Sequence, residues 1–292
     1  HLFVLPAGSG KSHVINALSS ENTTIVCPRN VLLSQLAKHG CKGRIVSRHK
    51  LFNEPDSNGT LIVDECHAVN DIGQYGEIFK RYDRIIGLTA TPFRLDCGNI
   101  SNLGWNLVYE LDEKTLIEQG FLCEIKYANV PTELIMNIEP VEYRDSKRLV
   151  RKAKSYIDRH IDWIIKNIDL GKHTLIFCTD INHCNQVVSR LGFGAAYHSK
   201  MSEKNLKEAM DYFVNEKGVL VSVESLNVGF DFPPCEQLIN LRPTSSYALY
   251  HQLTRRVSRP YKGKTQGLIY DFTFNRFDFE PKNKGFDTIC IF

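Results

Sequence analysis

The chain has 292 residues, of which 42% are apolar and 24% are charged, and its formal net charge is +3. This balance excludes a disordered or fibrous protein, and so small a net charge argues against coating nucleic acid by bulk charge. No apolar run approaches the ~20 residues that span a bilayer, and no signal-peptide pattern stands at the start. We therefore expect about two globular domains and no membrane partner.

The nine cysteines are scattered and include no C-x-x-C pair, which argues against a structural zinc site. Cys27 and Cys178 fall inside apolar runs, where cysteine usually acts as a small buried hydrophobe. Free thiols of this kind indicate a reducing, intracellular and cytoplasmic location. The first residue is His1 rather than Met, so we expect a trimmed chain.

Short apolar runs alternate with longer amphipathic segments along the whole chain. In the first half, strands are expected at residues 2–5, 23–27, 61–63 and 85–88, with helices at 11–18 and 31–39. In the second half, strands are expected at 174–178, 219–223, 237–241 and 267–272, with helices at 182–191 and 203–215. This alternation predicts an α/β fold with parallel sheets, and the continuous apolar runs indicate helices on both faces of each sheet.

The pattern changes in the middle of the chain. Residues 133–145 are polar, and apolar residues then recur at helical spacing between Leu149 and Ile168. We interpret the basic cluster at the start of this helix as a solvated face rather than a phosphate contact. We place a domain boundary near residue 140, which gives domains 1–140 and 141–292. The basic cluster comprises Arg144, Lys147, Arg148, Arg151, Lys152 and Lys154.

Residues 2–12 read as a strand, a glycine turn and a helix start. Gly8 and Gly10 let the backbone turn its N–H groups inward, which together with the helix N-terminus makes a polyphosphate site. Lys11 would reach the β- and γ-phosphates, and Ser12 would ligate Mg²⁺. Leu5 stands where the strict phosphate-loop spacing has Gly, so these residues alone leave open a plain glycine-rich turn. The expected nucleotide-binding residues here are Ala7, Gly8, Ser9, Gly10, Lys11 and Ser12.

An apolar strand ends in two carboxylates at Asp64 and Glu65. Asp64 would hold Mg²⁺ through water, and Glu65 would orient and deprotonate the attacking water. A surface Asp-Glu pair is common taken alone. It becomes a poor explanation when the pair follows a phosphate loop by one or two α/β units.

These residues resemble superfamily-2 helicases. Residues 64–67, Asp-Glu-Cys-His, resemble the DExH box, residues 6–12 resemble motif I, where Leu5 is no anomaly, and residues 89–92 are similar to motif III. Residues 24–35 resemble motif Ia, and residues 46–51 resemble the next segment that contacts nucleic acid. In the second half, residues 175–179, 221–233 and 250–259 resemble motifs IV, V and VI, with Arg255 in place of the family's Gly.

The resemblance implies two RecA-like domains, 1–140 with motifs I to III and 141–292 with motifs IV to VI, which bind ATP and Mg²⁺ between them. His67 resembles the residue that couples the acidic box to motif VI. Gln252, Arg256 and Arg259 are expected on one helix face, with an arginine stabilising the transferring phosphoryl group. The implied catalytic residues are Lys11, Asp64, Glu65, His67, Gln252, Arg256 and Arg259, the metal ligands Ser12 and Asp64, and further nucleotide contacts Gly229 and Asp231.

The family grips mainly the backbone of one nucleic-acid strand, which positions it without reading its sequence. Residues 87–96 resemble DNA-directed members, namely bacterial and phage repair or recombination helicases and restriction-enzyme motor subunits, so DNA is expected rather than RNA. Protein partners in repair or recombination, and a phage- or virus-encoded protein acting in a host cell, fit this resemblance. The implied contacts are Arg29, Asn30, Arg48, His49, Thr89, Thr91, Thr179, His198 and Ser222.

The function expected from these residues is an ATP-dependent DNA helicase or translocase, which is a nucleic-acid-dependent ATP hydrolase. Three alternatives stay open. One is a nucleotide-gated DNA-binding or remodelling ATPase that does not separate strands. The second is an RNA helicase. The third is a P-loop nucleoside triphosphatase with no nucleic-acid partner, against which the resemblance to motifs Ia, IV and V argues.

Overall fold

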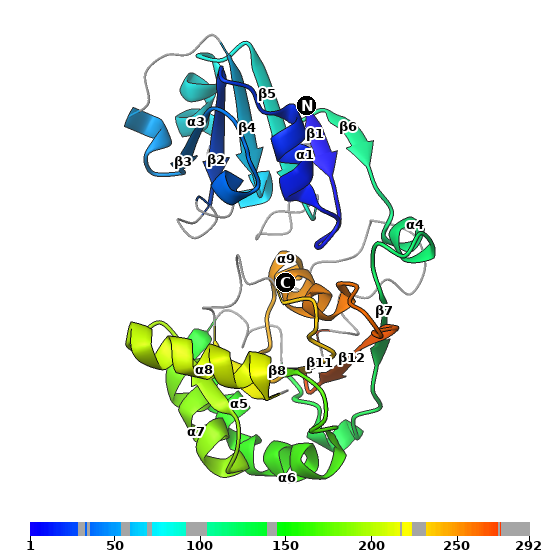
Figure 1. Ribbon diagram of the computed structural model, residues 1–292. Coiled ribbons are helices and arrows are strands. Elements are labelled where there is room, and N and C mark those ends of the chain that lie inside the picture. The colour runs from blue at the N-terminus through cyan, green and yellow to red at the C-terminus, as the bar shows by residue number, and fades with distance from the viewer. Residues whose placement is uncertain are drawn as a thin grey trace. The chain divides into compact units, whose positions relative to one another are not determined.

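The chain folds into two α/β units, each built on a six-stranded sheet (Figure 1). The computed structural model describes residues 1–28, 33, 36–53, 59–68, 72–91, 104–138, 145–216, 218–223, 232–273 and 275. The first unit is His1–Leu122 and the second is Cys123–Phe292. Every strand pairing in both sheets is parallel, which confirms the predicted fold class.

The first sheet has the strand order β3-β2-β4-β5-β1-β6. Its strands are β1 (Leu2–Val4), β2 (Thr23–Cys27), β3 (Arg44–Ser47), β4 (Thr60–Asp64), β5 (Arg84–Thr89) and β6 (Leu107–Glu110). The helices are α1 (Lys11–Leu18), α3 (Ile72–Phe79) and α4 (Glu113–Glu118), with 3-10 turns η1 (Leu51–Asn53) and η2 (Cys66–Ala68). The helix expected at 31–39 lies partly outside the described residues.

The second sheet has the strand order β7-β12-β11-β8-β10-β9. Its strands are β7 (Glu124–Tyr127), β8 (Thr174–Phe177), β9 (Ala195–Tyr197), β10 (Val219–Ser222), β11 (Gln237–Asn240) and β12 (Gln266–Asp271). The helices are α5 (Ser146–Ser155), α6 (Ile157–Asn167), α7 (Ile181–Leu191), α8 (Glu203–Asn215) and α9 (Tyr247–Thr254), with 3-10 turns η4 (Thr132–Leu134) and η6 (Arg255–Ser258). Over the ranges that the structure describes, none of the helices is both long and apolar enough to cross a membrane.

Alternating side chains of the first sheet supply two separate cores. In β4, Leu61 and Val63 pack in one cluster with Ile78 of α3, whereas Ile62 packs on the opposite face with Ile15 of α1. Successive residues of a strand point to opposite faces, so a strand that is apolar throughout requires a helix on each side. This requirement explains the three-layer arrangement that the apolar runs predicted.

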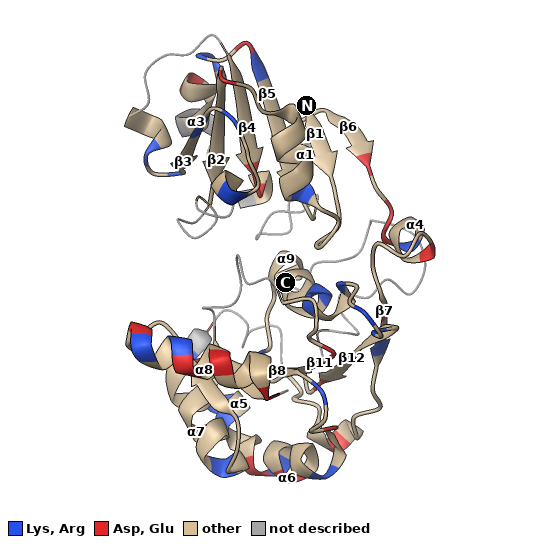
Figure 2. Cartoon of the chain, viewed as in Figure 1, with Lys and Arg blue, Asp and Glu red and all other residues tan. Residues whose placement is uncertain are grey.

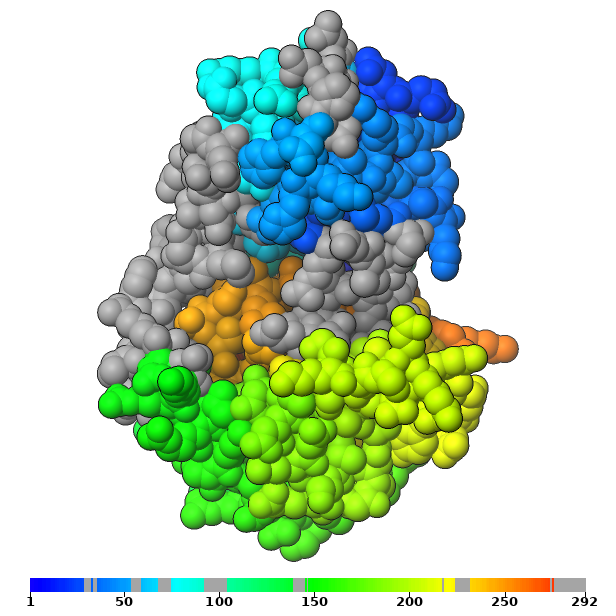
Figure 3. All heavy atoms as spheres, turned by 90° about the vertical axis from the view of Figure 1, so that its left-hand side faces the viewer, coloured from blue at the N-terminus to red at the C-terminus, as the bar shows by residue number. Residues whose placement is uncertain are grey.

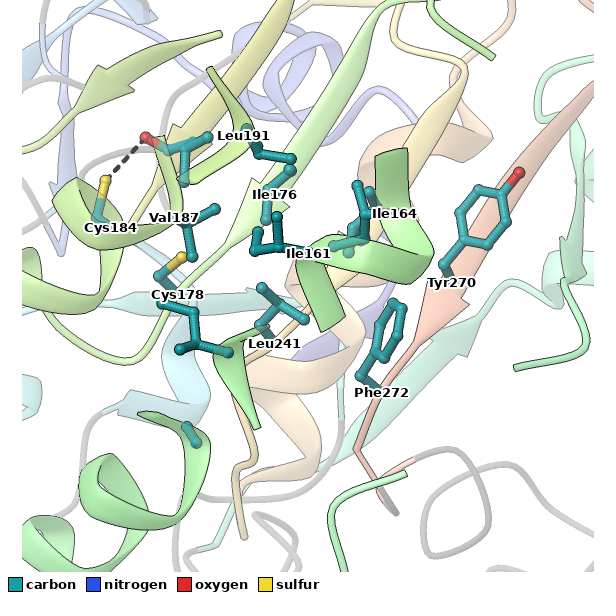
Figure 4. Packing of buried hydrophobic residues seen from close by; sticks show 14 of the residues in the cluster. Ile161, Ile164, Ile176, Cys178, Cys184, Val187, Leu191, Leu241, Tyr270 and Phe272 are labelled. Carbon is teal, nitrogen blue, oxygen red and sulfur yellow. Dashed lines mark hydrogen bonds between the residues drawn. The ribbon is translucent and has the colours of Figure 1, made fainter. Parts of the chain in front are cut away.

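The second sheet is covered in the same way. Ile176 of β8 packs with Ile161 and Ile164 of α6 and with Val187 of α7 (Figure 4). Its neighbour Phe177 faces the other layer, with residues of α8 and α9. In the space-filling view, segments coloured green to yellow-green, which include α7 and α8, form most of the visible surface of this unit (Figure 3). Both signs of charge are interspersed on α8, in keeping with the small net charge (Figure 2).

The division between the units comes earlier in the chain than the position near residue 140 that the sequence suggested. β7 pairs with β12, from Glu124 opposite Gln266 to Tyr127 opposite Ile269. A further parallel bridge joins Met136 to Thr273. Residues 123–138 therefore complete the second sheet, and the first unit ends at Leu122.

The amphipathic run that follows residue 145 is two helices rather than one. α5 ends at Ser155 and α6 begins at Ile157, with Tyr156 between them at φ −97° and ψ −6°. The apolar positions keep their helical spacing across the junction because Tyr156 remains in the right-handed helical region.

Gly87 in β5 is required by packing, because a Cβ built there would lie 2.6 Å from a ring carbon of Trp105 and 2.9 Å from Cys66 Sγ. We predict that Gly87→Ala lowers the free energy of unfolding by about 1–3 kcal/mol, the usual cost of overpacking a core. Urea denaturation measures this change. The matched control is Gly76→Ala in α3, where nothing lies within 4 Å of the new Cβ. That variant should be more stable by roughly 0.5–1 kcal/mol, and an equal shift in both variants would contradict the packing argument.

Candidate active site

Three loops of the first unit meet at the carboxyl edge of its sheet. β5 lies between β4 and β1, with Val4 opposite Thr89 and Asp64 opposite Leu88. β1 is followed by the glycine turn, β4 by Glu65, and β5 ends at Thr89. Open parallel sheets bind ligands outside the carboxyl ends of neighbouring strands whose connections diverge, and β1 and β2 are separated here by β5 and β4.

The glycine turn has the backbone of a phosphate-binding loop. Gly8 and Gly10 have φ of 86° and 87°, and Gly10 is the N-cap of α1. The first N–H groups of a helix have no partner within it, so they can donate to an anion. The Ser9 Oγ is buried and has no hydrogen-bond partner among the described residues. A polyphosphate oxygen would satisfy these donors, so the loop fits a nucleotide.

Lys11 and Glu65 face each other across this loop. The Lys11 Nζ donates one long hydrogen bond of 3.4 Å to Leu5 O and lies 3.9 Å from Glu65 Oε1. The Glu65 N–H donates to Asp64 Oδ1 at 3.0 Å, and Glu65 itself has φ of 50°. Positive φ in a residue other than glycine is strained, and such strain gathers at functional sites. Asp64 therefore ends the strand, and Glu65 turns out of it toward Lys11.

A chain of contacts leads from Glu65 to the end of β5. The His67 Nδ1 lies 3.3 Å from Glu65 Oε2 and 2.9 Å from Thr89 Oγ1. The Thr89 hydroxyl donates to Thr91 O at 2.8 Å and accepts from Thr91 N at 3.1 Å. Because the Thr89 proton is already used, its oxygen accepts from an Nδ1–H of His67, which assigns that tautomer. His67 thus joins the acidic box to Thr89 within the first unit, whereas its predicted coupling to motif VI stays a prediction.

The two carboxylates differ in their electrostatic surroundings. Burial raises the pKa of Asp64 to about 7, with the charge of Glu65 adding to the effect. Burial acts on Glu65 in the same direction, but Lys11 and His67 outweigh it and hold its pKa below the ordinary value. The lowered pKa favours the ionised form of Glu65. A cation beside Asp64 would lower the raised pKa of that carboxyl.

The predicted nucleic-acid contacts of the second unit lie at the carboxyl edge of its sheet. Thr179 follows β8, His198 follows β9, and Ser222 ends β10, three neighbouring strands. The Thr179 Oγ1 is 3.0 Å from His183 Nδ1, and the Ser222 Oγ donates to Tyr197 O at 2.9 Å. Sequence reasoning missed His183. The sequence feature that could have indicated this contact is the spacing, because His183 lies four residues after Thr179, in the first turn of the next helix.

Several of the predicted contacts are buried. Thr89 and Ser222 are 0% exposed and Thr91 is 1% exposed, so in this structure their side chains act on neighbouring groups rather than on a ligand at the surface. In contrast, Arg48 is half-buried and His49 is exposed, directly after β3. The remaining predicted residues lie outside the described ranges. They are Arg29, Asn30, Gly229 and Asp231.

The predicted single helix face of motif VI is wrong. Gln252 lies in α9, which ends at Thr254, while Arg256 lies in the 3-10 turn η6 and is buried. Arg259 follows that turn with φ −70° and ψ 132°. Pro260 explains the conformation of Arg259, because a residue before proline is driven out of the helical region. The backbone therefore has a different local conformation at Arg256 and at Arg259, so the two side chains do not extend from one helix face.

A phosphate loop and an acidic box at the carboxyl edge of a parallel sheet define a P-loop nucleoside triphosphatase core. The family described as "Helicase conserved C-terminal domain" matches residues 156–261, and the family described as "Type III restriction enzyme, res subunit" matches residues 42–94. The two matches fall in different units of the chain, and together with the helicase-named relatives they make the chain similar to superfamily 2 of the helicases, a family of ATP hydrolases.

Curated relatives come from phages, bacteria and yeast. A 51.5 kDa protein of a Lactococcus phage is 23% identical over 92% of this chain and 65% of its own length. A Schizosaccharomyces pombe protein that carries the name of a mitochondrial ATP-dependent helicase, irc3, is 29% identical over 73% of this chain and 38% of its own. The EcoAI type I restriction endonuclease subunit of Escherichia coli is 24% identical over 75% of this chain and 32% of its own.

Solved structures share the fold. A fragment titled as an HsdR subunit of a type I restriction enzyme from Vibrio vulnificus superposes with a TM-score of 0.72 at 18% identity, over 97% of this chain and 62% of that one. The type ISP restriction-modification enzyme LlaBIII, bound to DNA, gives 0.63 at 14% identity, over 92% of this chain and 26% of that one. The chain thus spans less than two thirds of the length of each of these relatives.

The buried contacts of Thr89 predict the effect of Thr89→Val, which keeps the shape of the side chain and removes its hydroxyl. The His67 Nδ1 and the Thr91 N–H would lose their acceptor, so we expect the free energy of unfolding to fall by about 1–3 kcal/mol. Denaturant unfolding measures this loss. Thr115→Val in α4, which removes only an exposed hydroxyl hydrogen bond to the cap residue Asp112, should stay within about 0.5 kcal/mol of the parent. An equally small effect at Thr89 would contradict the importance of its buried hydrogen bonds to His67 and Thr91.

Proposed function

We propose that this chain is the ATP-driven motor part of a DNA helicase or translocase. The observation that carries the proposal is the contact chain from Lys11 through Glu65 and His67 to Thr89, at the edge of a parallel sheet. It gathers a phosphate-binding cation and an ionised base in one place. In a member of superfamily 2, that arrangement supports hydrolysis of ATP.

The first unit contributes the groups that bind and attack the phosphate. In this proposal the glycine turn and Lys11 bind the β- and γ-phosphates of ATP, and Glu65 orients and deprotonates the attacking water. Ser12 and Asp64 would hold Mg²⁺. The ion supplies positive charge that neutralises the phosphates and favours the ionised form of Asp64.

The second unit contributes cations for the transition state. Arg256 and Arg259 would stabilise charge on the transferring phosphoryl group, a role that can raise kcat by several powers of ten. Gln252 would sense the nucleotide, with Gly229 and Asp231 as further contacts. His67 would couple the acidic box of the first unit to these residues. Cycles of nucleotide binding and hydrolysis would then shift the grip on a nucleic-acid strand.

The proposed track is DNA. Two findings favour it: a relative of this chain is a subunit of a type I restriction enzyme, and LlaBIII was solved bound to DNA. Loops at the carboxyl edges of both sheets would hold the strand by its phosphates. The alternatives are a nucleotide-gated DNA clamp or remodelling ATPase without strand separation, and an RNA helicase. A role in DNA repair or recombination, with protein partners there, belongs to the same proposal.

Steady-state ATP hydrolysis tests the proposal directly. The rate is measured for the 292-residue chain alone and with single-stranded, duplex and forked DNA and with RNA, and Lys11→Ala supplies the background rate. Stimulation by DNA and not by RNA is expected, and strand displacement on forked DNA then separates a helicase from a translocase. Equal rates with and without every nucleic acid would overturn the motor assignment and leave a P-loop nucleoside triphosphatase.

We predict that Glu65→Gln lowers kcat for ATP at least about 10²-fold while nucleotide binding persists, because the amide cannot accept the proton of the attacking water. Phosphate release gives kcat, and a fluorescent ATP analogue gives the Kd. Glu77→Gln is the control, since Glu77 is an exposed residue of the same unit that pairs with Lys80. Full activity of Glu65→Gln would remove Glu65 from its proposed role.

We also predict that Arg259→Ala loses hydrolysis and retains ATP binding, because an arginine that acts on the transition state adds little to the ground state. The same two measurements apply. Arg190→Ala, which removes a surface ion pair with Asp158 in the second unit, should leave both constants unchanged. Loss of ATP binding with preserved turnover of the bound nucleotide would show that Arg259 has a different role.

A further inference from the structure

The ends of motifs V and VI meet at one half-buried ammonium group in the second unit. The Lys264 Nζ donates to Pro233 O at 3.1 Å, to Cys235 O at 2.6 Å and to Arg259 O at 2.9 Å. Pro233 is the last residue of the motif V segment, and Arg259 is the last residue of motif VI. An ammonium group has three N–H donors, so three carbonyl groups use all of them.

Lys264 lies outside every motif recognised in the sequence and beyond residues 156–261, where the helicase family matches. It follows a tight turn in which its own N–H donates to Tyr261 O at 2.9 Å and Gly263 has φ of 83°. This turn brings the lysine back onto the carbonyl of Arg259, five residues earlier. Five cations fall between residues 255 and 264, and Lys and Arg gather in the segment directly after α9 (Figure 2).

We propose that Lys264 is a positioning residue for Arg259, fixing the backbone from which the catalytic guanidinium extends. Arg259 stands in extended conformation after η6, and its carbonyl accepts from the Lys264 Nζ at 2.9 Å and from the Cys123 Sγ at 3.8 Å. The Lys264 ammonium group is the charged donor of the two, and it connects that carbonyl to the end of motif V. This inference rests on the proposed function of Arg259 in ATP hydrolysis.

The backbone around Lys264 is held in place by close contacts with other segments of the second unit. The chain passes closely on the other side of the same turn, where the Cys123 N–H donates to Ser258 O at 2.6 Å. Gly267 in β12 lies so close to η6 that a Cβ there would collide with Val257 O. Burial lowers the pKa of the Lys264 ammonium group, because removal from water disfavours its charged form. The segment before Arg259 is therefore held from several sides.

A misplaced guanidinium affects the chemical step more than nucleotide binding. A shift of about 1 Å in a catalytic group can cost 10²-fold in rate. We therefore expect Lys264→Met, which keeps the length of the side chain and removes the charge, to lower kcat for ATP at least about tenfold. KM should change less than about threefold. Lys264→Arg retains a cation and donors and should recover part of the rate.

The test combines these variants with Arg259→Ala in a double-mutant cycle on the full chain. If Lys264 acts through Arg259, the double variant Lys264→Met/Arg259→Ala keeps the residual single-turnover rate of Arg259→Ala, which is measured above the Lys11→Ala background. If the fold-losses of kcat in the two single variants multiply in the double variant, the proposal is overturned, because Lys264 then acts independently of Arg259. Lys262→Met, an exposed lysine in the same turn, is the matched control and should keep the parent kcat.

Thermal unfolding of each variant shows whether Lys264→Met is still folded at the assay temperature. If it is not, the cycle is run with Lys264→Arg, whose smaller loss of kcat must also vanish in the Arg259→Ala background. A stable Lys264→Met with unchanged kcat would overturn this inference and leave the proposed function intact. A parent chain without any ATP hydrolysis above the Lys11→Ala background would overturn the proposed function itself.

Discussion

The parallel pairing of β5 with both β4 and β1 is the constraint on which the site depends. Gly87 lies opposite Leu2 on one side and Val63 on the other, so the ladders of three strands meet at one residue of β5. A slip by one residue would turn every side chain of β5 to the other face of the sheet. Thr89 would then leave His67. The missing side chain at Gly87 admits Trp105 to the core, so the same residue serves both the packing and the register.

Two adjacent carboxylates at the end of β4 raise an electrostatic difficulty that the structure resolves by separating their partners. Lys11 and His67 both face Glu65, while Asp64 receives the Glu65 N–H. The positive φ of Glu65 allows this, because it turns the second carboxylate away from the strand direction that the first one keeps. Lys11 and His67 lower the pKa of both carboxylates, but only at Glu65 do they outweigh burial. The strained backbone of Glu65 carries the carboxylate that pairs with Lys11, in keeping with the tendency of strain to gather at functional sites.

The strands predicted from the sequence are the internal strands of both sheets, and the described strands that were missed are the four edges. Internal strands such as β4 are buried on both faces and read as continuous apolar runs. The edges β3, β6, β7 and β9 each pair on one side only, and β6 is exposed along its whole length. A strand that borders solvent needs no apolar run, so its sequence carries little signal. The boundary near residue 140 differs from the observed division for the same reason, because β7 is one of those edges.

In the site, as in the sheets, features set by neighbouring residues could be predicted from the sequence, and features set by residues far apart in the chain could not. The glycine turn and the acidic box are short sequence motifs, and the extended conformation of Arg259 follows from Pro260, which also stands in the sequence. The expectation of one helix face for Gln252, Arg256 and Arg259 used their spacing and overlooked that proline. The lysine that holds the Arg259 carbonyl could not be predicted from spacing. Its three acceptors come from two segments that are separated by all of β11 and α9, and only the fold brings them to one ammonium group.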